Sequence, residues 1–404
     1  MDTATVLTVF CIVYIGMFLG EIPGLKLDRT GIALLGAIAL IASGEMTPRA
    51  AWDSVNVSAI SLLLGLMVVS AQFKLGGFYT LVTRRLANAE VPPQALLAML
   101  IGVSGLLSAL LVNDVVCLAV TPLLIEGCAK RGLDPVPFLL ALACSANIGS
   151  AATLIGNPQN MLIGQVLRLS FTGYLGFSLI PAIAGLGAVW LVVFLLYRNR
   201  WQKETALSEV YEPELNRWQS VKGVMVLAAL VIAFLFTPWP RDTLALAAAG
   251  FLLTSRKTST RDVLGLVDWQ IIVLFIGLFV VNSAFDKSGL LASAMSEARA
   301  HGLDTANPAT LFGATVILSN LVSNVPAVML LLHTASHPLS GPILALASTL
   351  AGNLLIVGSI ANIIVVDLAK RAGVSITWRE HARAGIPVTV ATLSFAGAWL
   401  WIMS

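Results

Sequence analysis

The chain has 404 residues, of which 57% are hydrophobic and only 11% are charged, and its mean hydropathy is +0.89. Soluble domains carry about 25% charged residues, so the composition excludes an ordinary soluble protein and predicts a polytopic membrane protein. The formal net charge of +3 gives no reason to expect nucleic-acid binding, because the basic residues sit in short loops between apolar runs.

Apolar runs divide the first half of the chain into predicted membrane spans. A helix needs about 20 residues to cross the hydrocarbon core, and the run at about 4–20 approaches this length. Glu21 follows it without a small-residue cleavage pattern, so the run is predicted to be a retained span rather than a signal peptide. The other predicted spans of this half are about 31–45, 54–73, 136–167 and 171–197.

Polar interruptions occur in two long runs of the first half. The run at about 92–128 is too long for one crossing and contains Asn113 and Asp114. It is predicted to be a re-entrant hairpin that enters and leaves on the same side, with the acid at its tip. The run at about 136–167 is interrupted by Gly156–Asn160, and a proline in that segment removes a backbone donor and clashes with the preceding turn. This run is therefore predicted to be a broken span.

The second half repeats this arrangement after a polar linker. Residues 198–220 form the one long polar stretch and are predicted to be a cytoplasmic linker. The run at about 305–336 is predicted to be a second hairpin with its tip at Asn324. The run at about 338–366 is predicted to be a second broken span, interrupted at Gly358–Asn362. The remaining predicted spans are about 221–239, 243–255, 269–285 and 384–402.

The basic residues indicate the orientation of these segments. If Lys26 and Arg29 are cytoplasmic and each hairpin returns to its own side, most of the 24 basic residues lie at cytoplasmic ends, as the positive-inside rule requires. The first hairpin then has its base inside and the second has its base outside. We therefore predict an all-α polytopic membrane protein with two inverted repeats, 1–197 and 221–404. Each repeat has about five transmembrane spans, one of them broken, and one re-entrant hairpin.

The polar interruptions also predict the function. Polar residues at membrane depth are costly unless they face a protein-lined cavity, and two matching sets indicate a transporter with its site between structural repeats. Asp114 is the one ionisable side chain predicted far from a membrane surface, which suits a proton carrier or a cation ligand. A neutral aspartate that caps a helix is the alternative. Asn113 and Asn324 offer donors and acceptors to a hydroxylated solute or an ion.

Two groups of site residues are predicted. In the alignment of the two tips, Ser323 takes the place of Asn113, and Asn324 takes the place of Asp114. No Lys or Arg lies near any of the four interruptions in the sequence, which favours a neutral polyhydroxy solute or an exchanged cation over a dianion. The predicted solute-binding residues are Asn113, Ser323, Asn324, Gly156, Asn157, Asn160, Gly358, Ser359 and Asn362.

Residues further from the tips form the second group. Asn147, Thr349 and Asn353 either line the same cavity or join helices through hydrogen bonds. Cys117 and Cys144 are further candidates for lining the cavity. They are predicted to be buried small hydrophobic residues rather than metalloid ligands, because scattered single thiols make poor chelates. No metal site is predicted, and the only cofactor expected is a coupling ion, H⁺ or Na⁺. The absence of HExxH and GxSxG motifs argues against an enzyme.

At these residues the chain resembles the ion transporter superfamily, which includes arsenite permeases, sodium/proton antiporters and sodium/dicarboxylate symporters. The tips Asn113-Asp114 and Asn324-Val325-Pro326 are most similar to those of the arsenite permeases, as is the tail from Val374 to Gly385. The segment Gly156–Asn160 is closer to the pattern of the symporters and the P protein.

The resemblance implies export of arsenite and antimonite trihydroxides by proton antiport across a bacterial-type inner membrane. It also implies a soluble arsenical ATPase subunit as a partner, and a homodimer is one candidate assembly. Two alternatives stay open, a sodium/proton antiporter with Asp114 as an ion ligand and a sodium-coupled organic anion transporter. Sodium dependence separates the first alternative from the metalloid exporter. The lack of Ser-Asn-Thr tips and of nearby basic residues counts against the second.

Overall fold

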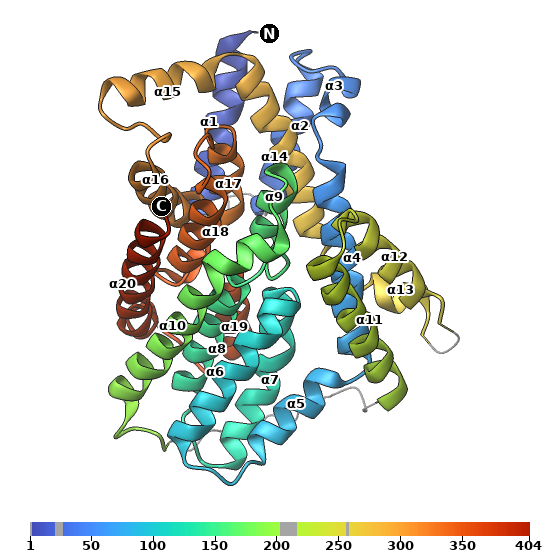
Figure 1. Ribbon diagram of the computed structural model, residues 1–404, viewed down its shortest axis with the longest axis vertical. Coiled ribbons are helices and arrows are strands. Elements are labelled where there is room, and N and C mark those ends of the chain that lie inside the picture. The colour runs from blue at the N-terminus through green and yellow to red at the C-terminus, as the bar shows by residue number, and fades with distance from the viewer. Residues whose placement is uncertain (1, 21–26, 203–215, 256–257) are drawn as a thin grey trace.

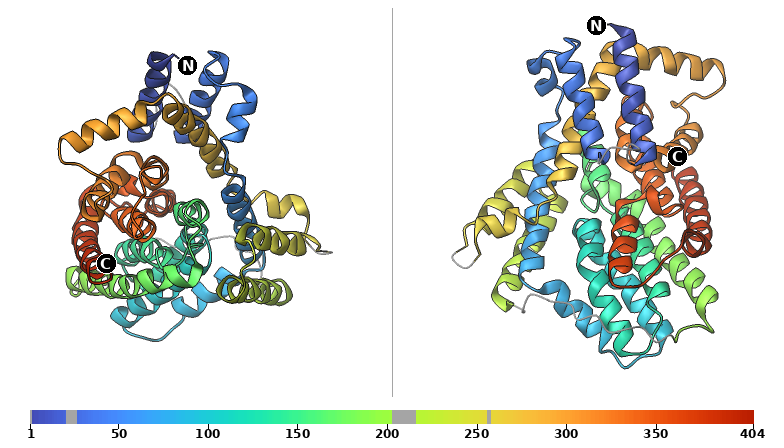
Figure 2. Two further views of the ribbon diagram at one scale, coloured as in Figure 1. Left: turned by 45° about the horizontal axis from the view of Figure 1, so that its top comes forward. Right: turned by 180° about the vertical axis from the view of Figure 1, so that it is seen from behind.

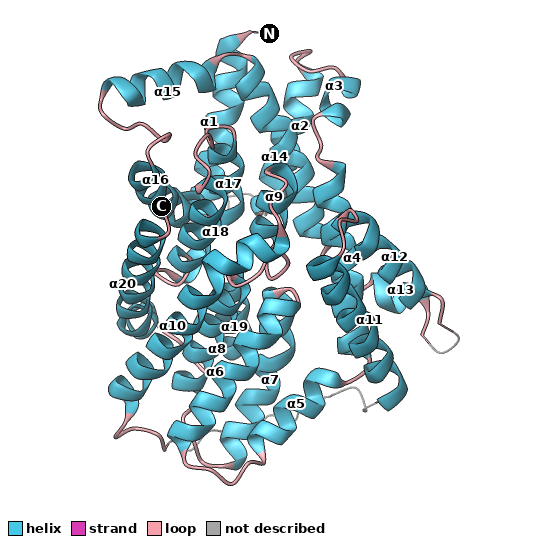
Figure 3. Ribbon diagram, in the orientation of Figure 1, coloured by secondary structure: helices cyan, strands magenta, loops and turns pink. Residues whose placement is uncertain are grey.

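The computed structural model describes residues 2–20, 27–202, 216–255 and 258–404. Within these residues every named element is a helix (Figure 3). Six of the described helices are long and apolar enough to cross a membrane, judged by length and composition: Val57–Leu75, Pro93–Leu110, Phe171–Tyr197, Arg217–Phe236, Trp269–Lys287 and Trp378–Ile402.

The same order of helices occurs twice along the chain. The first half contains α1 (Thr3–Leu19), α2 (Arg29–Ala42), α3 (Pro48–Asp53), α4 (Val57–Leu75), α5 (Phe78–Ala87), α6 (Pro93–Leu110), α7 (Asn113–Lys130), α8 (Pro135–Ser150), α9 (Pro158–Val166) and α10 (Phe171–Tyr197). The second half contains α11 (Arg217–Phe236), α12 (Arg241–Leu253), α13 (Thr260–Leu264), α14 (Trp269–Lys287), α15 (Leu290–Ala300), α16 (Pro308–Val322), α17 (Asn324–Leu332), α18 (Ser340–Ala351), the short 3₁₀-helix η1 (Ile356–Gly358), α19 (Ile360–Arg371) and α20 (Trp378–Ile402).

The two repeats have opposite orientations. In Figure 1 the hairpin α6–α7 and the helix α5 lie in the lower half of the view, whereas α16–α17 and α15 lie in the upper half. The helices α1, α2, α4, α11, α12 and α14 form one side of the molecule, and the hairpins and broken helices form the other (Figure 2). These features match the predicted fold class, with one hairpin and one broken helix in each half.

The helix breaks follow from local sequence. In the first break Pro158 occupies the first turn of α9, where its missing N–H costs nothing, and the side chain of Asn157 caps the helix by accepting from the Asn160 amide at 2.8 Å. Gly156 is required by space, because a Cβ there would lie 2.4 Å from the Ser150 carbonyl oxygen. The second break has no proline and contains η1 instead.

Four short helices were not predicted from the sequence. The helices α3, α5, α13 and α15 carry charged side chains and are too short and too polar to stand out as apolar runs. Residues 203–215 of the predicted linker lie outside the described residues. The helix α11 begins at Arg217, so the last residues of the predicted linker, 217–220, are helical. The assignment of the linker to the cytoplasm stays a prediction.

Close helix packing repeats between the halves. A Cβ on Gly65 of α4 would lie 2.6 Å from the backbone carbon of Ala245 in α12. A Cβ on Gly277 of α14 would lie 2.7 Å from the backbone carbon of Ala33 in α2. Small residues let helix backbones approach in membranes, so these two glycines fix equivalent helix crossings in the two repeats.

We expect Gly65→Ala to destabilise the folded protein, because the added methyl group meets the backbone of Ala245 rather than a movable side chain. Overpacking of this kind costs about 1–3 kcal/mol. Thermal unfolding of the purified variant in detergent measures the effect. Gly102→Ala is the matched control, since a Cβ at Gly102 has no neighbour within 4 Å. Equal melting temperatures for the two variants would contradict the proposed close packing.

Candidate functional site

The hairpin tips and the helix breaks of both repeats meet around a central cavity. Its volume is about 40 Å³, enough for about three water-sized groups at roughly 10–15 Å³ each. The apolar part of its wall comes from the second hairpin and from α1, α9, α14 and α19. The polar lining residues are Arg29, Asn113, Asp114, Gln159, Ser323, Asn324 and Ser359.

The first hairpin tip is held against the first helix break. The backbone N–H of Asn113 donates to the Gly156 carbonyl at 3.0 Å. Its side-chain Nδ2 donates to Asn147 Oδ1 at 3.2 Å. Within the described residues, Asn113 Oδ1 has no hydrogen-bond partner although it is buried. An acceptor is therefore left unused at the edge of the cavity.

Asp114 is the second residue of α7 and lies beside Asn113 in the cavity wall. It is only 8% exposed. Within the described part of the chain, its carboxylate forms no side-chain hydrogen bond and no ion pair. An unpaired carboxylate away from water is costly, and a bound proton, a cation or a hydrogen-bond donor relieves that cost. The position therefore suits a group that binds one of these reversibly.

At the second tip, Ser323 has an unusual backbone conformation, and both ends of the Asn324 side-chain amide form hydrogen bonds. Ser323 has φ 75°, which non-glycine residues rarely adopt, and strain of this kind is concentrated at functional sites. With the amide of Asn324 oriented to suit its neighbours, its nitrogen donates to the carbonyls of Ser348 at 2.9 Å and Gly358 at 3.2 Å. Its oxygen accepts from Gln159 Nε2 at 3.3 Å. The second tip is thus joined to both helix breaks.

The first residues of α7 and α17 show how the two hairpin tips align, and this alignment differs from the predicted one. Two residues separate α6 from α7, but only Ser323 separates α16 from α17. Asn113 and Asn324 are therefore the first residues of equivalent helices. Asp114 corresponds to Val325, which also lines the cavity. The alignment of Ser323 with Asn113 was wrong by one residue, and the carboxylate has an apolar counterpart.

Asn160 and Asn362 lie behind the cavity wall rather than in it. Both are fully buried third residues of the helices that follow the breaks. Asn160 Nδ2 donates to the carbonyl of Thr153 at 2.9 Å, and Asn362 Nδ2 donates to the carbonyl of Gly352 at 2.8 Å. Each side chain satisfies backbone groups that the break leaves unpaired. In this structure the two side chains therefore support the breaks, and neither lines the cavity to which they were predicted to contribute.

The remaining glycines and amides of the breaks also support the site from behind. Gly156, Asn157 and Gly358 do not line the central cavity. Asn157 Nδ2 donates to Thr349 Oγ1 at 3.2 Å, which also accepts from Gln159 Nε2 at 3.2 Å. Of the predicted solute-binding residues, those that the structure brings to the cavity are Asn113, Ser323, Asn324 and Ser359.

Asn147 connects the two repeats at the centre of the molecule. Its Nδ2 donates to Asn353 Oδ1 at 2.9 Å and to Asn362 Oδ1 at 3.1 Å. Its Oδ1 accepts from Ser359 Oγ at 2.8 Å and from Asn113. Of the two predicted roles for this residue, the structure gives it the one that joins helices. Thr349 and Asn353 likewise lie outside the cavity wall, as do the buried thiols Cys117 and Cys144.

We expect Asn147→Ala to lower the melting temperature strongly, because it leaves several buried polar groups without partners. Each group orphaned in this way costs about 1–3 kcal/mol. The measurement is thermal unfolding in detergent beside Asn88→Ala, which truncates an exposed asparagine whose side chain forms no hydrogen bond within the described residues. Equal stability of the two variants would show that the Asn147 network does not hold the repeats together.

Two polar residues of the cavity wall were not predicted as site residues: Gln159, which lies inside the first interruption, and Arg29. Arg29 begins α2 and lines the central cavity with Asp114. Its Nε donates to the Met17 carbonyl at 3.2 Å, and its Nη2 donates to the Val357 carbonyl at 3.5 Å. The expectation that no basic residue lies near the motifs was therefore wrong. Sequence distance hid the contact, because Arg29 is far along the chain from all four interruptions.

Comparison with known proteins identifies the family. The profile of the citrate transporter family, CitMHS, matches residues 12–351. The chain belongs to this family. Membership confirms the predicted resemblance to the ion transporter superfamily and makes the chain a multi-pass membrane transporter.

Curated proteins with several different names align with nearly the whole of this chain. The silicon efflux transporter LSI3 of Oryza sativa subsp. japonica is 29% identical over 92% of each chain. The 46 kDa membrane protein of Mycobacterium leprae is 27% identical over 98% of this chain and 97% of its own. The putative transporter arsB of Dictyostelium discoideum is 22% identical over 91% of this chain and 86% of its own.

A solved structure supports the fold of the family member. The YdaH transporter of Alcanivorax borkumensis superposes with a TM-score of 0.59 at 16% sequence identity, over 99% of this chain and 98% of the other. The likeness is one of architecture.

Proposed function

We propose that this transporter exports small neutral hydroxides of the arsenite and antimonite type, with protons moving in the opposite direction. The size and the polar lining of the central cavity are the main support for this proposal. Its volume is about 40 Å³, and its polar wall consists mainly of amide and hydroxyl groups, with the carboxylate of Asp114 and the guanidinium of Arg29. A solute of a few heavy atoms with several hydroxyl groups suits that size and that chemistry.

The coupling uses the carboxylate of Asp114. A hydroxyl of the solute donates to this carboxylate, and another donates to the unused Oδ1 of Asn113. The proton and the solute then compete for Asp114, because each relieves the cost of the buried charge. The protein moves its site from one face of the membrane to the other readily only when Asp114 is occupied by either a proton or the solute. Export of solute is therefore tied to entry of protons.

The names of two relatives support this solute class. Silicic acid and arsenous acid are both small, neutral and fully hydroxylated at neutral pH. A silicon efflux transporter and a putative transporter named arsB both align over most of this chain. The same amide-lined cavity could bind either kind of hydroxide through the same hydrogen bonds.

The test is transport into everted membrane vesicles energised by a pH gradient, with radiolabelled arsenite or antimonite, with and without sodium. Proton-dependent uptake that does not need sodium is the expected result. If sodium addition dissipates the pH gradient and no metalloid enters, the protein is a sodium/proton antiporter and the proposal fails.

A second candidate, organic anion transport, is favoured by Arg29 and by the name of the family. Two donor groups of Arg29 already serve the carbonyls of Met17 and Val357, which weakens its availability to an anion. The cavity of about 40 Å³ is also far smaller than the roughly 300–1,000 Å³ of pockets that hold larger organic ligands.

We therefore expect Arg29→Gln, which keeps one side-chain amide donor group in place of two guanidinium donors, to lower metalloid transport by less than about tenfold, as for a net loss of about one hydrogen bond at roughly 1 kcal/mol. Citrate uptake should be absent from the unmodified protein and from the variant. Citrate uptake by the unmodified protein that disappears in Arg29→Gln would establish the second candidate instead.

A further inference from the structure

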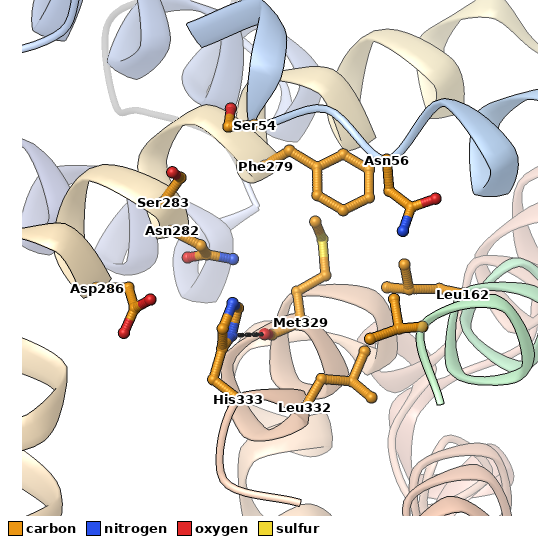
Figure 4. A pocket seen from close by; sticks show the side chains of 11 residues that line it. Ser54, Asn56, Leu162, Phe279, Asn282, Ser283, Asp286, Met329, Leu332 and His333 are labelled. Atoms are coloured by element: carbon orange, nitrogen blue, oxygen red, sulfur yellow. Dashed lines mark hydrogen bonds between the residues drawn. The ribbon is translucent and has the colours of Figure 1, made fainter. Parts of the chain in front are cut away.

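A second cavity lies apart from the central one and is larger, with a volume of about 260 Å³. Figure 4 shows that it lies between α14, α17 and α9, below the connection from α3 to α4. Its apolar wall includes Phe279, Met329 and Leu332. Polar side chains, among them Asn56, Asn282, Asp286 and His333, occupy the rest of the wall. The mechanism described above uses none of them.

Asn282 presents an unused donor to this cavity. The side chain is only 5% exposed. Its Oδ1 accepts from the hydroxyl of Tyr14 at 2.8 Å. Its Nδ2 has no partner among the described residues, and Figure 4 shows the nitrogen turned toward the cavity. A buried donor that faces a cavity without a partner points to a ligand with an acceptor oxygen.

Acceptors lie on the same side of the cavity. Asp286 is one turn beyond Asn282 on α14 and is exposed, and its carboxylate forms no hydrogen bond or ion pair within the described residues. His333 follows α17, and its Nδ1 lies 3.1 Å from the Met329 carbonyl, so Nε2 is the ring nitrogen left for other contacts. A ligand here meets an amide donor, a carboxylate acceptor and an imidazole.

This combination selects the charge of the ligand. The carboxylate of Asp286 disfavours an anion, and the N–H of Asn282 is directed where a bare metal cation would need an oxygen ligand. A neutral solute that carries hydroxyl groups satisfies both, because each hydroxyl can accept from an amide and donate to a carboxylate. The cavity is also roomy enough to hold such a solute with some of its water.

The two cavities are connected through α17. The first residue of this helix, Asn324, lines the central cavity, and His333 at its other end lines the second cavity. The Tyr14 hydroxyl that donates to Asn282 also lies 3.4 Å from the carbonyl of Pro326, a central-cavity residue near the tip. Occupancy of the second cavity can therefore affect the hairpin that forms the central one.

We propose that the second cavity is an outer solute site that binds the same class of small neutral hydroxide and delivers it to, or receives it from, the central cavity. This inference rests on the proposed function. It assigns Asn282 as the donor and Asp286 as the acceptor of the outer site.

The test is equilibrium binding of radiolabelled antimonite to the purified full chain in detergent. Two antimonite molecules per chain are expected. Asn282→Asp keeps an oxygen for Tyr14 but removes the donor, and it should reduce the count to one, as should Asp286→Asn, which changes an exposed side chain. Asn113→Ala should remove the other site, and a double variant should bind none. Asn88→Asp repeats the same chemical change at an exposed asparagine and should keep two.

The outcomes separate this inference from the proposed function. A single bound antimonite that is lost in Asn113→Ala and kept in Asn282→Asp and Asp286→Asn would overturn the outer site and leave the proposed function standing. No antimonite binding at all would overturn both. In transport, the outer-site variants should raise the KM for antimonite at least tenfold with little change in the maximal rate, whereas a purely structural defect would lower the maximal rate.

Discussion

Replacing Asp114 with asparagine is expected to abolish metalloid accumulation driven by a pH gradient. Asparagine has nearly the same shape as aspartate but cannot bind and release a proton. The solute and the proton can then no longer compete for this side chain. Solute binding should weaken as well, since a hydrogen bond to a charged group is worth about 1.5–3 kcal/mol, or roughly 10- to 100-fold. Solute-for-solute exchange in the absence of a gradient should persist at a reduced rate. Proteoliposomes with radiolabelled antimonite measure both activities.

Glu126→Gln is the matched control for Asp114→Asn. It neutralises the other acid of α7, which forms an ion pair with Lys130 at the far end of the helix from the cavity. This control should retain the full pH-driven activity. If Asp114→Asn also retains it, protons do not couple through this carboxylate and the proposed mechanism is wrong.

Asn324→Ala is expected to reduce transport by about 100-fold, because three hydrogen bonds of roughly 1 kcal/mol each are lost at once. The Asn324 amide joins the second hairpin tip to Ser348, Gly358 and Gln159. Without it, the tip no longer closes the cavity against the two breaks. Initial rates of antimonite uptake at matched protein levels measure the effect.

Asn320→Ala provides the comparison within the same hairpin. Asn320 donates to the carbonyl of Val316 in its own helix and does not line the central cavity. Its loss should change uptake by less than about tenfold, as for a single neutral hydrogen bond. Equal losses in the two variants would mean that the hairpin only needs to be intact and that Asn324 has no special place at the tip.

The helix breaks could be predicted from the sequence because their causes are local. Pro158 cannot continue a helix, and apolar runs that exceed one membrane thickness must fold back or break. The polar residues at the tips mark the centre of the molecule for the same reason. Charged short helices such as α5 and α15 give no comparable signal, because nothing in their composition distinguishes them from loops.

Which side chains point into the cavity and which point away from it could not be predicted from the sequence. The distinction between Asn113, which lines the cavity, and Asn160, which supports a break, depends on which side of each helix meets the other repeat. The one-residue difference between the two tips also shifts the equivalence of Asn324. Arg29 reaches the site only because α2 packs beside α14 in the folded molecule, and no local pattern records that contact.

The most direct test of the central claim is proton release on solute binding. Antimonite is added to the purified protein in a weakly buffered solution, and the pH is followed with an indicator dye. Competition between solute and proton for Asp114 predicts that protons are released on binding and that Asp114→Asn releases none. Saturable antimonite binding without proton release, or equal release from Asp114→Asn, would contradict proton-coupled export through this cavity.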